Sequence, residues 1–363
     1  MDCKAEVKPV SEIKSTNILP QSRYWADLKS RSGYRPNCFE LRVSSRWLDP
    51  KRKDKIVCDD LLVLIRKVNK DRCFAYVPYG PKIEPLFEYQ GVFLEELSET
   101  LRSQLPGNCV FIRYDLLWEN QWSGEEEYYD TYGNWIGPPS QKAQEVRVNF
   151  NTRHWKLQKS PTDHLPKNTF FLDLTKSEYE LLMDMKYNTR HSIRKAMKNG
   201  IKIKECRVDH LEDWYQLYAE TAERNNMPAD NREYFYDLLE NERTNSVKVK
   251  LLMAKHLSDY VAGMFLLLSK DRATYLFGAS TLTKRHLKAS YALQWDAIKR
   301  AIAYGCREYD MFGCAPNKDQ THPLSGVHRF KKGFGGEIFH RMGCWDYPYK
   351  EEDYQLMRQA VTI

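Results

Sequence analysis

The stretch Val261-Ala-Gly-Met-Phe-Leu-Leu-Leu268 is the longest apolar run of the chain. It is far shorter than the ~20 apolar residues that a membrane-spanning helix needs, and its length fits a buried β-strand. Apolar runs also lie before and after it, at Val247–Ala254 and Ala273–Phe277. We therefore predict three consecutive strands in this part of the sequence.

The elements on either side of these strands indicate the fold class. We predict helices at Thr189–Lys198, His210–Arg224, Arg232–Glu240 and Ala289–Tyr304, and a last strand at Glu308–Met311. This order of helices, three strands, helix and strand is typical of an acyltransferase fold of the N-acetyltransferase type. It differs from the steady βαβ alternation of a doubly wound sheet. The predicted class is therefore α+β, with mixed α/β units.

The first half of the chain repeats part of this order. A strand that ends at Gly80, a helix and a strand that ends at Asp115 are echoed by the same series between Gly278 and Asp310. Two copies of one α/β unit would account for the length of 363 residues. The predicted domains are residues 1–160, completed by 318–363, and residues 161–317.

Two local features add expectations about the chain between these elements. The spacing Thr175-x-x-Glu178 predicts a capping box at the start of a helix. Residues 1–20 are polar, so we expect them to fray.

Composition and motif searches exclude several classes of protein. The chain is 42% hydrophobic and 29% charged, which suits a folded protein rather than a disordered one. Met1–Thr16 has no apolar signal core, and the nine cysteines include no CxxC pair, which favours a reducing cytoplasm. No GxxxxGK[ST], GxGxxG or HExxH motif occurs. We therefore expect neither a metal nor a nucleotide cofactor.

The net charge of +7 lies in the second half of the chain. Residues 1–150 hold 22 basic and 22 acidic residues, whereas residues 151–363 hold 34 basic and 27 acidic residues. Such an asymmetry indicates a polyanionic partner for the second half. A water-exposed surface with scattered charge is the alternative.

Two basic segments bear on this choice. Residues 186–204 carry seven cations and no acid, and Arg190 and Arg194 would share one face of a helix. Such a stripe suits nucleic-acid phosphates, and a solvated basic face is the alternative. Lys288, before the helix at Ala289, stands where N-acetyltransferases use glycine to approach the pyrophosphate of coenzyme A. Coenzyme A is therefore not the expected acyl donor.

The segment His322-Pro-Leu-Ser-Gly-Val-His-Arg-Phe-Lys-Lys-Gly-Phe-Gly-Gly-Glu337 places three glycines beside Arg329, Lys331 and Lys332. Glycine lets the backbone approach a ligand closely, and a lysine can hold a phosphate or a developing oxyanion. The alternative is a basic hairpin with glycine turns.

This last segment resembles the terminal signature of the FemABX family, aminoacyl-tRNA-dependent transferases that build peptidoglycan cross-bridges. Further segments resemble the family in the same order: Gln21–Lys29, Asn188–Gly200, Glu220–Arg224 and Tyr275–Ser280. The resemblance spans about residues 21 to 340. It implies two tandem N-acetyltransferase-like domains with a cleft between them. Because only Lys204–His210 joins a strand to the next helix, it also implies no coiled-coil arm, as in the compact FemX-type members.

The resemblance implies a reaction and its partners. An amine of the stem peptide would attack the ester carbonyl of an aminoacyl-tRNA, and the acceptor would be lipid II or UDP-MurNAc-pentapeptide. No cofactor is implied. The enzyme would be a monomer in the cytoplasm, either free or in peripheral contact with the inner face of the membrane. The alternatives are an acyl-CoA-dependent N-acyltransferase of the same fold and a non-catalytic RNA-binding protein.

The resemblance also implies roles for particular residues. Lys331, beside Phe330, would stabilise the oxyanion, with Lys332 as the alternative. Substrate contacts would map to Lys29, Asp115, Tyr234, Tyr275 and Phe277, and tRNA or phosphate contacts to Arg190, Arg194, Lys288, Arg329 and Lys332.

Two of these positions depart from the family pattern. Asp230 stands where a phosphate-binding arginine is expected, and Phe277 replaces a frequent tyrosine. The proton of the attacking amine would pass to Asp115 or to a ribose hydroxyl of the tRNA itself.

Overall fold

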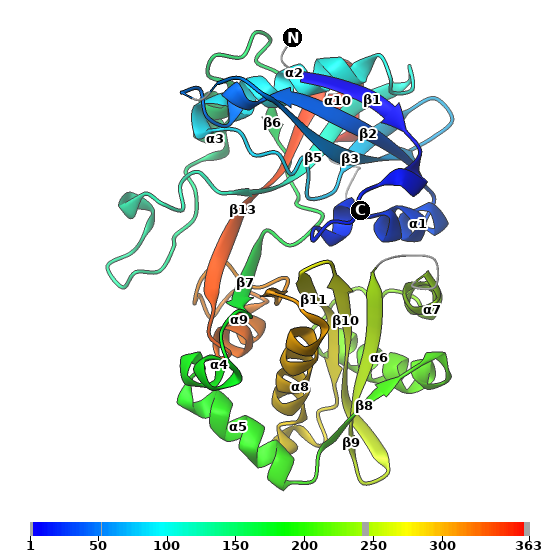
Figure 1. Ribbon diagram of the computed structural model, residues 1–363, viewed down its shortest axis with the longest axis vertical. Coiled ribbons are helices and arrows are strands. Elements are labelled where there is room, and N and C mark those ends of the chain that lie inside the picture. Colours follow the sequence, from blue (N-terminus) through cyan, green and yellow to red (C-terminus); the bar gives the residue numbers. More distant parts are fainter. Residues whose placement is uncertain (1–2, 52, 242–246, 359–363) are drawn as a thin grey trace. The chain divides into compact units, whose positions relative to one another are not determined.

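The computed structural model describes residues 3–51, 53–241 and 247–358, and the chain forms two compact units (Figure 1). Unit 1 comprises Met1–Lys14, Pro20–Lys167 and His340–Ile363, and unit 2 comprises Ser15–Leu19 and Asn168–Phe339. No helix within the described ranges is long and apolar enough to cross a membrane.

Unit 1 is built on a mixed sheet with the strand order β1-β2-β3-β4-β5-β13, and β6 pairs with β13. Its last strand, β13, begins in unit 2 and enters unit 1 at His340. The strands are β1 (Cys3–Lys8), β2 (Tyr34–Ser44), β3 (Ile56–Lys67), β4 (Cys73–Val77), β5 (Cys109–Glu119), β6 (Gln158–Lys159) and β13 (Glu337–Pro348). The helices are α1 (Arg23–Arg31), α2 (Gln90–Arg102), α3 (Gln141–Asn149) and α10 (Glu351–Met357).

Unit 2 has the strand order β7-β12-β11-β10-β9-β8. The strands are β7 (Asn168–Asp173), β8 (Lys202–Cys206), β9 (Lys248–His256), β10 (Asp259–Ser269), β11 (Arg272–Ser280) and β12 (Glu308–Asp310). The helices are α4 (Glu178–Asp184), α5 (Tyr187–Lys198), α6 (Leu211–Arg224), α7 (Arg232–Glu240), α8 (Ala289–Tyr304) and α9 (Ser325–Lys332). The three predicted consecutive strands are confirmed as β9, β10 and β11, which pair in antiparallel order.

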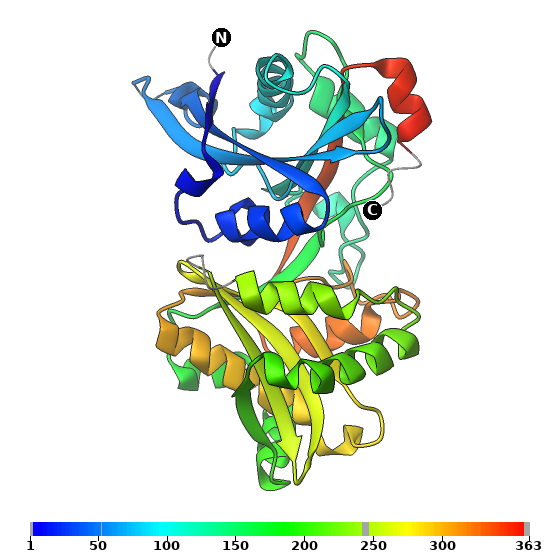
Figure 2. The same ribbon diagram turned by 90° about the vertical axis from the view of Figure 1, so that its right-hand side faces the viewer.

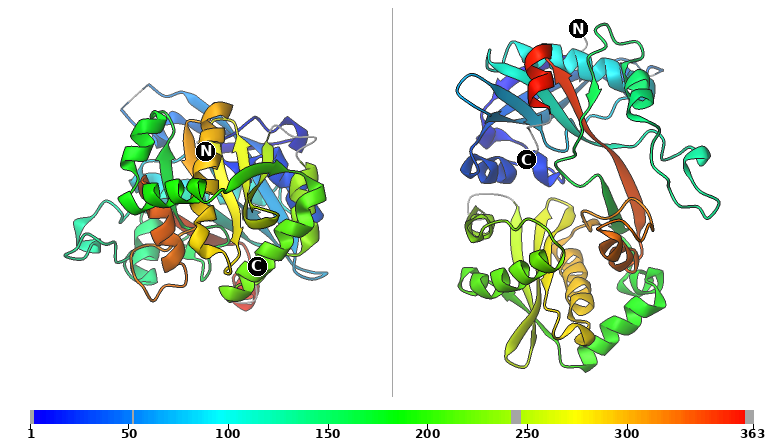
Figure 3. Two further views of the ribbon diagram at one scale, coloured as in Figure 1. Left: turned by 90° about the horizontal axis from the view of Figure 1, so that it is seen from below. Right: turned by 180° about the vertical axis from the view of Figure 1, so that it is seen from behind.

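The unbroken apolar run of β10 is explained by helices on both faces of the unit 2 sheet. Met264 and Leu266 belong to the core beneath α8, whereas Phe265 meets Trp214 of α6 at 5.0 Å between ring centroids. Gly263 lets Trp214 come close, because a Cβ there would lie 2.9 Å from the indole. Figure 2 shows α6 and α7 in front of the strands, and the right-hand view of Figure 3 shows α5 beside α8.

The predicted internal repeat is present as two strand–helix–strand motifs. β4 and β5 are parallel and joined through α2, and β11 and β12 are parallel and joined through α8. In each unit a buried tyrosine ties the second strand to the helix. The Tyr114 hydroxyl lies 2.9 Å from Ser98 Oγ of α2, and Gln294 of α8 donates to the Tyr309 hydroxyl at 2.7 Å.

Two local expectations were wrong. Residues 3–8 do not fray but form β1, which pairs with β2 and buries Cys3 and Ala5. The capping box lies two residues later than predicted, because Thr175 bonds to Asp173 instead. Ser177 is the N-cap of α4, and its partner is Glu180.

The glycine-rich segment is a helix followed by a tight turn, not a hairpin. α9 ends at Lys332, and β13 starts at Glu337. Residues 318–339 also belong to unit 2, not to unit 1 as predicted, because Phe334 is buried in the unit 2 core. Between β8 and α6 the structure has only the short turn Val208–His210, which matches the expectation of no coiled-coil arm.

Candidate active site

Lys331 points into unit 2 from the last turn of α9. Its ammonium donates hydrogen bonds to the backbone carbonyls of Gly313 at 2.7 Å and Phe312 at 3.1 Å. It also lies 5.1 Å from the ring centroid of Tyr275, and the residue is only 6% exposed. Burial lowers the pKa of Lys331 to about 8. The side chain is thus a fixed cation whose proton is easier to lose than that of a surface lysine.

The loop that holds Lys331 is itself fixed by Asp310. Phe312 has a left-handed backbone with φ of 57°, which is unfavourable for a residue other than glycine. The Asp310 carboxylate accepts a hydrogen bond from the Phe312 N–H at 2.8 Å and from the Thr169 hydroxyl at 2.5 Å. Asp310 therefore turns the two carbonyls toward Lys331. Sequence reasoning assigned it no role.

Tyr275 of β11 lies under the Lys331 ammonium. Burial raises the pKa of Tyr275 to about 12, so its hydroxyl keeps its proton at neutral pH. A Cβ on Gly278 would lie 1.7 Å from this hydroxyl oxygen, so only glycine leaves room for the ring. The Tyr-x-x-Gly spacing in the sequence is thus a packing requirement of the site.

The other predicted substrate contacts of unit 2 form an aromatic group. Tyr234 of α7 meets Phe277 of β11 edge to face at 6.0 Å, and Tyr218 of α6 meets Phe277 at 6.0 Å. Burial raises the pKa of Tyr234. Asp230 accepts a hydrogen bond from the Tyr218 hydroxyl at 3.0 Å. The acid at the expected arginine position therefore anchors the segment before α7 to α6.

The two arginines predicted on α5 differ in surroundings. Arg190 donates to the carbonyls at the end of α4, namely those of Leu182 at 3.1 Å, Met183 at 3.2 Å and Met185 at 2.5 Å. Its guanidinium thus satisfies the unpaired carbonyls of a helix end and complements the helix dipole. Arg194 is exposed.

The other predicted phosphate ligands lie at helix ends. Lys288 is the N-cap of α8 and has a left-handed backbone with φ of 59°, the conformation that glycine would favour at this position. On α9, Arg329 is exposed and Lys332 is half-buried.

The glycines after α9 are required by packing, and the approach of a ligand stays a prediction. A Cβ on Gly333 would lie 2.4 Å from Thr189 Oγ1, and one on Gly336 would lie 2.3 Å from the Phe171 carbonyl. Phe330 packs against Tyr291 of α8, with 5.0 Å between ring centroids. These residues therefore pack α9 against its neighbours so that Lys331 faces inward.

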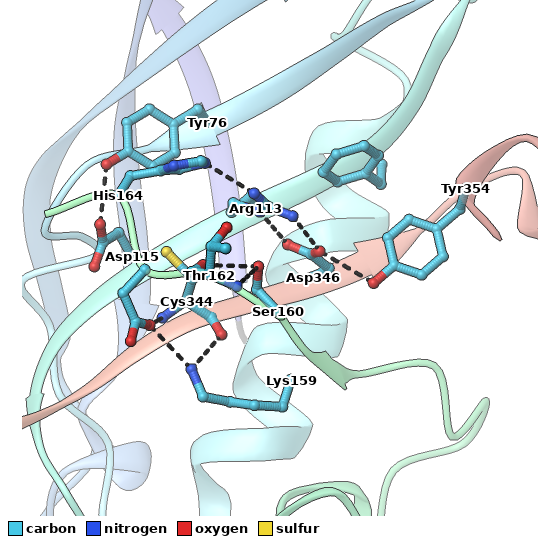
Figure 4. A network of polar contacts seen from close by, with 12 residues as sticks. Tyr76, Arg113, Asp115, Lys159, Ser160, Thr162, His164, Cys344, Asp346 and Tyr354 are labelled. Atoms are coloured by element: carbon cyan, nitrogen blue, oxygen red, sulfur yellow. Dashed lines mark hydrogen bonds and ion pairs between the residues drawn. The ribbon is translucent and has the colours of Figure 1, made fainter. Parts of the chain in front are cut away.

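Unit 1 contains Lys29 and Asp115. The Lys29 ammonium lies 5.1 Å from the Trp25 ring on α1. Asp115 of β5 is buried, and its Oδ2 accepts from the Tyr76 hydroxyl at 3.0 Å (Figure 4). The same oxygen accepts from the Leu165 N–H at 2.8 Å. Burial, and then the charge of Asp163, raise the pKa of Asp115 to about 6.

A buried ion pair that sequence reasoning missed adjoins Asp115. Arg113 makes two bonds to the Asp346 carboxylate, at 2.7 and 2.8 Å, and the Tyr354 hydroxyl donates to the same carboxylate at 3.0 Å (Figure 4). His164 Nε2 lies 2.8 Å from Arg113, and burial and Arg113 lower the pKa of His164 to about 3. The signal was present, because Arg113 interrupts the otherwise apolar start of β5.

The structure thus brings together some of the predicted residues within each unit. Lys331 meets Tyr275, and Tyr234 meets Phe277. Lys29 and Asp115 belong to unit 1, and all the other predicted site residues belong to unit 2.

Comparisons with known proteins bear on the family and the fold of the chain. A model of the FemAB family matches residues 6–261 and 241–361. The aminoacyltransferase FemA of Staphylococcus epidermidis is 21% identical over 428 residues, which cover 97% of this chain and all of that protein. The lipid II:glycine glycyltransferase of Staphylococcus haemolyticus is 22% identical over 258 residues, or 54% of this chain. The chain spans 62% of the length of that relative.

Two solved structures share the fold. The crystal structure of FemX has a TM-score of 0.72 at 16% identity and covers 96% of both chains. A tandem N-acetyltransferase-type protein of the clavulanic acid pathway has a TM-score of 0.51 at 10% identity, over 95% of this chain and 98% of that one. The predicted fold of two tandem N-acetyltransferase-like domains is confirmed.

Proposed function

Since this chain belongs to the FemAB family, we propose that it moves an amino acid from an aminoacyl-tRNA to the stem-peptide amine of a peptidoglycan precursor. The named activities of two relatives, FemA and the lipid II:glycine glycyltransferase, support transfer of an aminoacyl group. The acceptor would be lipid II or its UDP-linked precursor. The reaction would take place in the cytoplasm or at the inner face of the membrane.

The observation that carries this proposal is the geometry of Lys331. Attack of the amine on the ester carbonyl forms a tetrahedral intermediate with a negatively charged oxygen. A fixed donor beside such an oxygen lowers the barrier by about 3–4 kcal/mol. Lys331 is held by two carbonyls and stays mostly protonated at neutral pH, since its pKa is about 8. Its remaining hydrogen-bonding capacity would serve the oxyanion.

The proton balance of this reaction needs no metal or cofactor. The C–N bond forms, the C–O ester bond breaks, and the amine proton ends on the ribose oxygen that leaves. Lys331 is unsuited to take this proton while it stabilises the oxyanion as a cation. We therefore favour transfer through a ribose hydroxyl of the tRNA, with Asp115 as the alternative acceptor.

The basic residues of unit 2 would bind the polyanionic substrates. Arg194 and Arg329 are exposed, and Lys288 stands at the start of α8, which supports a role for each in binding phosphate. Arg190 acts mainly through the end of α4, where its guanidinium is already engaged. The aromatic group of Tyr234 and Phe277 would pack against the precursor.

The decisive experiment incubates the protein with mixed labelled aminoacyl-tRNAs and a muropeptide precursor and follows the products by mass spectrometry. We expect one amino acid to be added to the precursor, and the added mass identifies the amino acid. As a control, the same reaction is run with the variant Lys4→Met, which changes an exposed lysine of β1. This variant should react as the wild type does. Transfer from acetyl-coenzyme A with none from tRNA would instead support the acyl-CoA-dependent alternative. Binding of RNA without any transfer would support the RNA-binding alternative.

A further inference from the structure

Three lysines of unit 2 come from separate segments and gather around one buried histidine. Lys186 precedes α5, Lys318 lies in the loop before α9, and Lys332 ends α9. In the part of the chain that the structure describes, none of the three forms an ion pair with an acid. Like charges repel, so such a group without a carboxylate is costly unless an anion binds to it.

Backbone and side-chain hydrogen bonds fix how these segments meet. The Lys186 N–H donates to the Gly333 carbonyl at 2.9 Å, which places the start of α5 beside the end of α9. His328 lies one turn before Lys332 on the same face of α9. Its Nδ1 lies 2.8 Å from the Ala315 carbonyl, three residues before Lys318. Figure 1 shows α9 beside α4, the helix that leads into α5.

The electrostatics of the group agree with this geometry. Burial, and then the charges of Lys318 and Lys186, lower the pKa of Lys332. Burial and the same three lysines lower the pKa of His328, so its ring is neutral. His328 is 4% exposed, and its Nε2 is buried without a hydrogen-bond partner. Because Nδ1 donates to the Ala315 carbonyl, Nε2 of the neutral ring is an acceptor, so it is the three cations that would meet an anion.

The start of α5 adds to the positive potential. Lys186 is the N-cap of this twelve-residue helix and makes no side-chain capping bond. The N-terminus of a helix carries partial positive charge and exposed N–H groups, which favour a bound anion. The nearest acid in sequence, Asp319, already accepts from the N–H and hydroxyl of Thr321. No carboxylate therefore competes for the lysines from this loop.

We infer that Lys186, Lys318 and Lys332 form a binding site for a single phosphate group. The identity of the phosphate rests on the proposed function, which offers two sources. One is a backbone phosphate of the donor RNA, and the other is the diphosphate of the precursor. We assign the site to the RNA, because Lys332 follows Lys331 directly and the reacting ester lies at the end of the RNA. The site would hold the RNA while its ester reaches Lys331.

The test measures binding of an uncharged RNA hairpin that ends in CCA, as a function of salt concentration. The double variant Lys186→Met/Lys318→Met should bind more weakly, and the negative slope d log K/d log[salt] should shrink in magnitude by about 0.7–0.9, the value for one lost phosphate contact. The matched control is Lys195→Met/Lys198→Met, two exposed lysines of the same α5. Equal changes in both double variants would mean a diffuse basic surface and would overturn the site.

A competition experiment distinguishes the sources of the phosphate. Inorganic phosphate and the UDP-linked precursor are each titrated against the labelled RNA hairpin in wild type and in the double variant. Inorganic phosphate should compete at millimolar concentration in wild type only. Displacement by the precursor at much lower concentration would overturn the assignment to RNA and favour its diphosphate. If inorganic phosphate and the precursor each compete equally well in wild type and in the double variant, the site itself is overturned.

Folding and turnover are controlled separately. Lys332→Arg keeps the charge and should bind RNA nearly as wild type, whereas Lys332→Met should not. Thermal unfolding of every variant identifies any that fail to fold, and Lys318 is exposed, so its substitution should leave the fold intact. Because the hairpin is uncharged, binding does not depend on transfer. Normal, lysine-dependent binding without any aminoacyl transfer would therefore contradict the proposed function and leave the phosphate site standing.

Discussion

Each of the two strand–helix–strand motifs carries a Tyr–Asp pair on its second strand, and the aspartate has a different role in each motif. Tyr114 and Tyr309 both bond to the helix of their unit. Asp115, next to Tyr114, is sealed by the Tyr76 hydroxyl and the Leu165 N–H. Asp310, next to Tyr309, instead shapes the loop whose carbonyls hold Lys331.

The difference shows how one duplicated unit can serve two purposes. In unit 1 the charged residues near the aspartate satisfy each other, as Arg113 and Asp346 do. In unit 2 the buried Lys331 is satisfied by neutral carbonyls and stays mostly protonated at neutral pH. Substitutions in the first group should therefore reduce stability, and substitutions in the second should reduce turnover.

The largest effect on stability is expected from Arg113→Met. Its removal leaves the fully buried Asp346 carboxylate without its cation, which costs about 3–5 kcal/mol of unfolding free energy. Urea unfolding would measure the loss. The double variant Arg113→Met/Asp346→Leu should recover most of it, and the folded fraction should turn over normally. A stable Arg113→Met protein with reduced kcat would break the comparison.

Lys331→Met should reduce kcat by about 100- to 1000-fold, the effect of one lost oxyanion donor. Stability should fall by only about 1–3 kcal/mol, because the carbonyls of Phe312 and Gly313 lose their partner. In the wild type, kcat should fall as the pH rises through about 8, where Lys331 loses its proton. Single-turnover transfer from aminoacyl-tRNA checks both points. Full activity of Lys331→Met would remove Lys331 from the mechanism.

Asp115 should make the stability of the protein depend on pH. The folded state raises its pKa from the ordinary value of 3.8 to about 6, so between these values the folded state binds the proton more tightly than the unfolded state. Its contribution to stability is therefore greatest at low pH and is lost as the pH rises from about 4 to about 6. Two pKa units correspond to about 3 kcal/mol.

Asp115→Asn should remove this part of the pH dependence. Urea unfolding of both proteins at several pH values between 4 and 7 measures it. If the unfolding free energies of the two proteins change with pH in the same way, the burial of Asp115 does not contribute to the pH dependence of stability. The kinetics of the same variant separate two roles, since a raised KM with unchanged kcat indicates binding, and a lower kcat indicates a part in proton transfer.

The smallest effect is expected from Arg190→Gln in unit 2. The loss of hydrogen bonds to the end of α4 should cost about 1 kcal/mol of stability. The salt slope of RNA binding should barely change, whereas Arg194→Gln, from the same helix, should affect RNA binding without loss of stability. A reversed result would show that Arg190 leaves the carbonyls to bind phosphate.

Periodicity and apolar runs were enough to predict most of the elements. The β10 run and the strand–helix–strand echo depend on local pattern, and both are present in the structure. The capping box was misplaced because Thr175 has a competing partner two residues earlier, Asp173. Local sequence cannot rank two such hydrogen bonds.

The inward direction of Lys331 could not be predicted. It depends on the left-handed Phe312 and on Asp310, which lies 21 residues away along the chain. The packing role of the signature glycines could likewise not be predicted, because their neighbours, such as Phe171, come from distant segments. Arg113 was visible as a charge in an apolar strand, but its partner Asp346 lies 233 residues away.

The path of β13 means that the sheet of unit 1 can be completed only late in translation. All of unit 2 precedes His340 in the chain, whereas the sheet of unit 1 lacks its last strand until Pro348 has emerged. During translation the sheet of unit 1 therefore cannot be completed until after unit 2 has been synthesised, and Arg113 lacks its partner Asp346 until then. A nascent chain released before this strand would keep the charged Arg113 in an unfinished sheet without its carboxylate partner.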